Sequence, residues 1–111
     1  MAIRRIAQEH EAKLTSVGAQ SVAGKVECKT YGDGERALEA KVRDLGDVAP
    51  EYPLQLFLND ALVGELERTR NKAELELDSR DGDPVPSCAA GDRVELRSGE
   101  LILTSGVFYV D

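Results

Sequence analysis

Apolar and polar residues alternate with a period of two along most of the chain from residue 22 onward. Such alternation is typical of strands that bury one face and expose the other. It predicts strands over residues 22–29, 38–43, 54–58, 62–67, 73–78, 93–97, 101–103 and 107–110. Turn-forming residues separate these segments at intervals of about ten residues, a spacing typical of antiparallel sandwiches and barrels.

We therefore predict an all-β fold, an antiparallel β-sandwich or barrel of about eight or nine short strands over residues 20–111. Asn59 and Asp60 predict a tight turn, because both residues tolerate a left-handed backbone. The pair Ser98–Gly99 predicts a hairpin, and Ser105–Gly106 predicts a break before the last strand. A chain of 111 residues is expected to form a single domain.

Residues 1–16 follow a different period. Apolar or packable side chains recur there at spacings of three, four and four residues: Ile3, Ile6, His10 and Leu14. This spacing predicts an N-terminal amphipathic helix. A helix this short is marginal in water unless it docks on something. It is expected either to cover one end of its own barrel or to meet another chain, and the sequence does not separate these alternatives.

Charge and composition narrow the function classes. The chain has 14 Lys and Arg against 21 Asp and Glu, a formal charge of −7, which argues against a nucleic-acid partner. No stretch approaches the ~20 apolar residues of a membrane helix, so no membrane partner is expected. No secretory signal is recognisable, which predicts a cytoplasmic location. Whether Cys28 and Cys88 form a disulfide is left open.

Few residues are suited to catalysis or metal binding. His10, the only histidine, lies on the apolar stripe, and Cys28 is in register with the buried face of its strand. We therefore expect no enzyme activity, no cofactor and no metal site. The acidic loop at residues 78–83 would suit calcium, but Arg80 occupies the third position, where an EF-hand loop needs an oxygen ligand.

The outward positions of the predicted strands carry charges of both signs, as in Lys25, Glu27 and Lys29. We expect opposite charges to face each other across strands, where each pair would contribute about 0.2–1 kcal/mol. Such charges also keep a sheet from joining other sheets. The charged face is therefore interpreted mainly as the solvent-exposed side of the sheet.

Some strands carry apolar residues on both faces, which indicates a buried strand or a patch that meets another chain. We therefore expect a non-catalytic structural or protein-interaction module that self-associates or joins a larger assembly. The residues expected at the contact are Ile3, Ile6, Leu14, Phe57, Ile102, Phe108 and Val110. The alternative is a glycan- or small-ligand-binding module that uses Tyr31 and Tyr52 with nearby carboxylates, although the chain has no Trp for a sugar platform.

Overall fold

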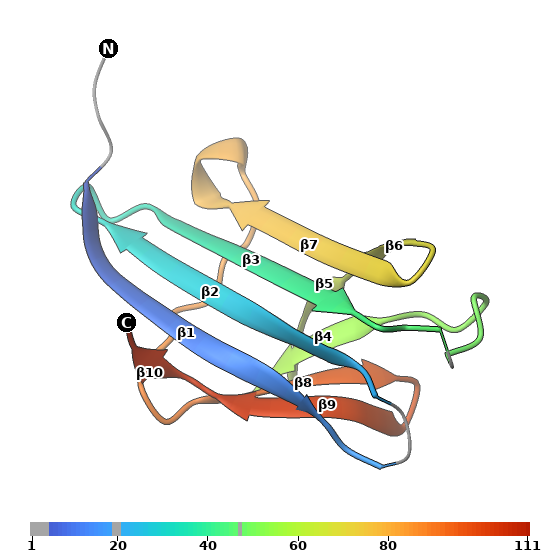
Figure 1. The fold of residues 1–111 in the computed structure, drawn as a ribbon. Helices are drawn as coiled ribbons and strands as arrows, with labels where there is room; N and C mark the ends of the chain where they lie inside the picture. The colour runs from blue at the N-terminus through green and yellow to red at the C-terminus, as the bar shows by residue number, and fades with distance from the viewer. Residues whose placement is uncertain (1–4, 19–20, 47) are drawn as a thin grey trace.

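The structure is a computed structural model that describes residues 5–18, 21–46 and 48–111. Every strand pairing in it is antiparallel (Figure 1). The strands are β1 (Ile6–Ser16), β2 (Ala23–Tyr31), β3 (Arg36–Arg43), β4 (Gln55–Leu58), β5 (Ala61–Glu65), β6 (Glu67–Thr69), β7 (Lys72–Asp78), β8 (Arg93–Ser98), β9 (Leu101–Val107) and β10 (Tyr109–Val110). The predicted all-β antiparallel class is confirmed.

The strands form a nearly closed, barrel-like sheet. Nine of them follow the order β5-β4-β8-β9-β1-β2-β3-β7-β6, and β10 pairs with β1 beside this path. The two ends of the path, β5 and β6, are consecutive in the chain and only Leu66 separates them. The sheet therefore curls until its ends meet at this bend, as expected when a twisted sheet buries one face on itself.

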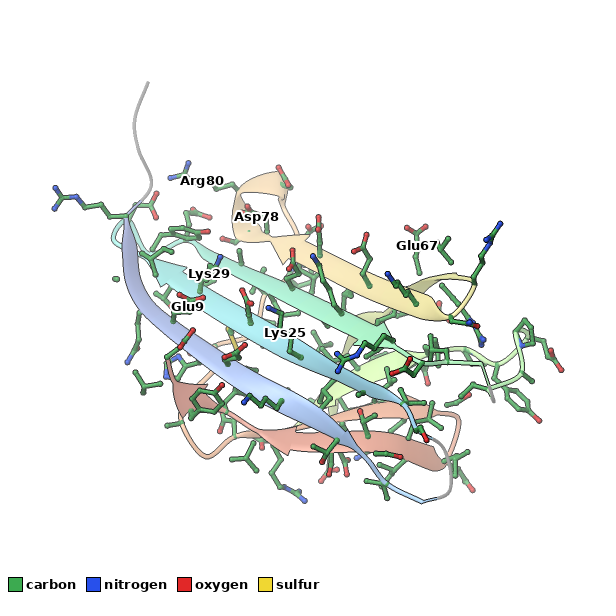
Figure 2. The ribbon with its side chains drawn as sticks, viewed as in Figure 1. Glu9, Lys25, Lys29, Glu67, Asp78 and Arg80 are labelled. Carbon is green, nitrogen blue, oxygen red and sulfur yellow. A yellow bond between two sulfur atoms is a disulfide. The ribbon has the colours of Figure 1, made fainter. Side chains whose placement is uncertain are left out.

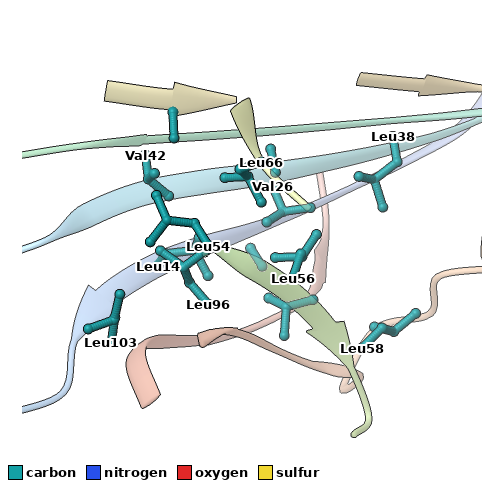
Figure 3. Packing of buried hydrophobic residues seen from close by; sticks show 14 of the residues in the cluster. Leu14, Val26, Leu38, Val42, Leu54, Leu56, Leu58, Leu66, Leu96 and Leu103 are labelled. Carbon is teal, nitrogen blue, oxygen red and sulfur yellow. The ribbon is translucent and has the colours of Figure 1, made fainter. Parts of the chain in front are cut away.

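One hydrophobic core fills the inside of this sheet (Figure 3). The inward positions alternate with charged outward ones, as the period of two predicts. Leu56 of β4 lies opposite Leu96 of β8, and both are fully buried. The turn between β4 and β5 follows the sequence prediction: Asn59 and Asp60 both have a left-handed backbone, with φ of 47° and 69°.

The prediction of an N-terminal helix is wrong for the residues that the structure describes. Residues 6–16 form the strand β1, and residues 1–4 lie outside the described part. His10 and Leu14 are four residues apart, a spacing that fits one face of a helix and also one face of a strand. The inner face of β1 consists of His10, Ala12 and Leu14, all buried. Pairing with β2, β9 and β10 decides the outcome, because tertiary context overrides weak local preference.

A second correction concerns Gly106, which was expected together with Ser105 to separate the last two strands but lies inside β9. A Cβ atom at Gly106 would come within 2.2 Å of the backbone oxygen of Lys13 in β1. This glycine therefore allows two backbones to approach closely, a common role for glycine within a strand.

The two cysteines are paired. A disulfide joins Cys28 of β2 to Cys88, which lies in the segment between β7 and β8, and the two Cα atoms are 6.3 Å apart. Both residues are buried in the core cluster. The disulfide therefore ties this connecting segment to the inner face of the sheet.

Helical structure in the described residues is limited to one 3-10 turn, η1 (Ser79–Asp81). Among these residues there is accordingly no helix of the length and apolar character needed to cross a bilayer.

Candidate binding sites

The outer face of β1, β2, β3 and β7 carries many charged side chains (Figure 2). The strand register places several of them in rows of like sign. One row of carboxylates runs directly across four adjacent strands: Glu11, Glu27, Glu39 and Glu76. The neighbouring row places Lys13, Lys25 and Lys41 opposite one another. The expected pairing of opposite charges across strands is therefore only partly met: Glu9 faces Lys29 and Lys41 faces Glu74, whereas these two rows align like charges.

Opposite charges pair along each strand instead, between residues two positions apart. The Lys25 Nζ lies 2.8 Å from a carboxylate oxygen of Glu27, and the Lys41 Nζ lies 3.5 Å from one of Glu39. The hydrogen bond from Lys25 holds the pKa of Glu27 below its usual value, and the same bond raises the pKa of Lys25. These contacts offset part of the like-charge repulsion across strands.

A basic groove lies at one end of this face, with a volume of about 600 Å³. At the start of β2 the short residues Ala23 and Gly24 lie beside Arg43 and Val42 of β3, which leaves the hollow. Five cations line the groove together with one carboxylate: Lys13, Lys25, Lys41, Arg43 and Lys72, with Glu11. No ion pair joins Lys13 or Lys72 to any residue that the structure describes.

An acidic hollow of about 340 Å³ lies toward the other end of the same face, beside Ala37, whose side chain is short. Tyr31 and the carboxylates of Glu76 and Asp78 line it. In the adjoining loop, Asp78 accepts a hydrogen bond from the Arg80 backbone and Asp83 accepts one from the Asp78 backbone. The described residues contain no group of three or more His, Cys, Asp or Glu placed to hold a metal ion.

Tyr31 and Tyr52 do not come together. Tyr31 is the last residue of β2, at the turn that leads into the start of β3, whereas Tyr52 lies in the connection that follows the end of β3. The full length of β3 therefore separates them, so they cannot form one platform for a sugar ring.

The residues expected at a protein contact are dispersed. Ile3 lies outside the described residues, and Leu14 and Phe108 are buried in the core, which removes both from the surface. Phe57 is covered by Arg97, whose guanidinium carbon lies 4.3 Å from the ring centroid. Arg97 is itself fixed by Glu95 and by Asp60, the latter at 2.5 Å.

The remaining three lie on two separate surfaces. Ile6, at the start of β1, and Val110, which lies opposite His10, are exposed near the edge formed by β1 and β10. Ile102 is partly buried and lies opposite Arg97 on the outer face of β8 and β9. The predicted contact residues therefore do not form one patch.

Strand β10 is attached to β1 by a side-chain hydrogen bond that titrates. The Tyr109 hydroxyl donates to the Glu11 carboxylate at 2.6 Å, which raises the pKa of Tyr109 to about 12. Because the folded pKa lies above the value of about 10 for an unfolded chain, this stabilisation is present below about pH 10 and is lost as the pH rises toward 12.

We expect one of the three tyrosines to ionise at about pH 12 in an ultraviolet absorbance titration of the folded protein. Substituting Tyr109→Phe should remove this last step, and Glu11→Gln should shift it to lower pH because the carboxylate charge is gone. A step near pH 12 that persists in the Tyr109→Phe protein would show that another tyrosine is responsible.

A third hollow follows the free edge of β5, at the seam where no described strand pairing joins the two ends of the sheet. Strand β5 pairs with β4 on one side, and no described strand pairs with its other side. Beside it lies a groove of about 470 Å³, which we call the seam groove. Its lining is mostly apolar and includes Leu58, Leu62, Val63, Pro84, Val85 and Pro86.

The far wall of the seam groove, residues 84–86, is fixed but cannot complete the sheet. The Arg36 side chain donates two hydrogen bonds to the Val85 oxygen, at 3.1 and 2.9 Å. Pro84 and Pro86 have no N–H, so this segment lacks donors at alternate positions and is a poor partner for a strand. The free edge of β5 therefore faces a preformed apolar groove.

Sequence reasoning missed the residues that define both grooves. The sequence places Lys13 in the predicted N-terminal helix, Lys72 at the end of a predicted polar turn, and Leu62 at the start of a predicted strand. The alternating prolines at 84 and 86 were the one available signal, since they indicate extended backbone that cannot join a ladder on that side.

No protein-family model matches the chain, and no curated protein is significantly similar to it.

Proposed function

We propose that this chain is a non-catalytic protein-interaction module, and that it self-associates by pairing the free edge of β5 with β5 of a second copy. The observation that carries the proposal is the one-sided pairing of β5 beside the seam groove. Edge strands bind other strands because their unpaired N–H and C=O groups form a template.

The side chains of β5 favour this contact over the other edges. Leu62 on β5 is 59% exposed, among the most exposed large apolar side chains described. Natural edges are usually protected by charge or by shortness. The edge strand β6 follows that pattern with Glu67 and Arg68, and β10 has only two residues.

A two-fold axis would make the contact self-complementary. Two antiparallel β5 strands would lie side by side, and Leu62 of each copy would fill the seam groove of the other. Because β5 has only five residues, the interface is small, and we expect a weak dimer that forms with increasing concentration.

The histidine and the two cysteines, the side chains best suited to act as a base or a nucleophile, support a non-catalytic function. His10, the only histidine, is buried on the inner face of β1. Both cysteines are joined in a disulfide and cannot act as free thiols. Neither side-chain type is therefore available at the surface as a base or nucleophile.

We expect Leu62→Lys to dissociate the dimer, because a charge on this edge opposes strand pairing and cannot enter an apolar groove. The measurement is solution mass by light scattering over a range of concentrations. Leu101→Lys is the matched control, since Leu101 is 51% exposed and lies at the β8–β9 hairpin, outside the seam groove. A wild-type protein that stays monomeric at every concentration would contradict self-association, and equal effects of the two substitutions would contradict the role of β5.

We also propose an oxidising compartment for the protein, in place of the cytoplasmic location expected from the sequence. The disulfide between Cys28 and Cys88 supports this, because disulfides persist outside the reducing cytosol and are rare within it.

A further inference from the structure

The basic groove concentrates positive charge on a protein that is acidic as a whole. Five of the chain's 14 Lys and Arg residues line it, although the net charge of the chain is −7. Lys13, Lys25 and Lys41 lie directly opposite one another on three adjacent strands, so their Cα atoms follow the strand spacing of about 4.8 Å. Like charges in this position repel, and an anion lying across them would relieve that repulsion.

Contacts within the protein leave much of this charge unneutralised. Lys25 pairs with Glu27, and Lys41 pairs with Glu39 and lies opposite Glu74 of β7. Arg43 lies 3.7 Å from Asp44. Lys13 and Lys72, at opposite ends of the groove, have no ion pair with a described residue. An anionic ligand would therefore meet, at each end, a lysine that has no ion pair among the described residues.

The shape and surroundings of the groove limit the size of the ligand. It crosses β1, β2, β3 and β7, which corresponds to three strand spacings or about 14 Å. On this face the row of Glu11, Glu27, Glu39 and Glu76 runs alongside it. A long polyanion would be repelled there, so a short anionic ligand fits best.

The lining also indicates the chemical class. Proteins that bind single-stranded nucleic acids stack the bases on aromatic side chains, and no aromatic residue is among the described residues that line the groove. Lysines, an arginine and the hydroxyl of Thr15 suit a ligand that carries anionic groups and hydroxyls. We propose that the basic groove binds a short acidic saccharide through its carboxylate or sulfate groups. This site is separate from β5 and does not depend on self-association.

The test compares two acidic hexasaccharides, a sulfated one derived from heparin and a carboxylated oligogalacturonate, with neutral maltohexaose as the negative control. Binding is measured by isothermal titration calorimetry at several salt concentrations. The groove variant Lys13→Gln/Lys72→Gln removes the two lysines that have no ion pair among the described residues. The matched control, Lys29→Gln/Arg93→Gln, removes the same number of charges elsewhere on the surface.

We expect at least one acidic hexasaccharide to bind, and the better of the two identifies the anionic group. The groove variant should weaken binding about tenfold or more and reduce the slope of log affinity against log salt by about 2, while the control keeps wild-type affinity. The proposal is overturned if neither acidic saccharide binds or if both variants weaken binding equally. It is also overturned if a six-nucleotide single-stranded DNA binds more tightly than both saccharides.

Discussion

Reducing the disulfide between Cys28 and Cys88 is expected to lower the free energy of unfolding by about 4 kcal/mol. The two cysteines are 60 positions apart, and opening a closed loop of that length returns about this much conformational free energy to the unfolded chain. Urea unfolding with and without reductant measures the difference. Because both sulfurs are in the buried core, reduction should require prior unfolding.

The double variant Cys28→Ala/Cys88→Ala provides the control. It should be less stable than the oxidised wild type, and adding reductant should leave it unchanged. A wild-type protein with the same urea midpoint in both conditions would mean that the disulfide contributes nothing to stability.

Substituting Gly106→Ala is expected to destabilise the protein by about 3 kcal/mol, at the upper end of the usual cost of overpacking. The added Cβ would lie 2.2 Å from the Lys13 oxygen and 3.1 Å from the Lys13 carbonyl carbon. Both atoms belong to the backbone of β1, so they can move away only if β9 separates from β1. The same region holds the Thr15–Ser105 pairing that joins these strands.

Gly46→Ala is the matched control for this prediction. A Cβ at Gly46 would lie 3.8 Å from the Asn71 side-chain oxygen, which is ordinary contact, so the change should stay within about 0.5 kcal/mol. Thermal or urea unfolding compares the two variants. Similar stabilities for both proteins would contradict the close approach of β1 and β9.

The sequence predicts most of this fold because the alternation of apolar and charged residues is regular from β2 onward. It fails at β1 because the positions of His10 and Leu14 satisfy both helical and extended periods. The strand is selected by partners that are distant in the chain: β9 pairs with β1 from about 90 residues away, and β10 from about 100. Local pattern carries no information about such partners.

The candidate sites were harder to predict, because each depends on register. Lys25 and Lys41 each lie two positions from a glutamate in the sequence, so the sequence of each strand shows charges of both signs. Only the pairing of Lys25 with Lys41 produces a basic row. In the same way, Leu62 is exposed on a strand that has no described partner on its second side. The sequence of β5 does not show that this partner is missing.

The central claim is that copies of this chain join along β5. Backbone hydrogen exchange at low and high protein concentration tests it most directly. Amides on the free edge of β5 should exchange rapidly in the dilute protein and become protected as the concentration rises, while those of β6 stay unchanged. Exchange in β5 that is the same at both concentrations, while the mass of the protein increases, would place the contact elsewhere and contradict the claim.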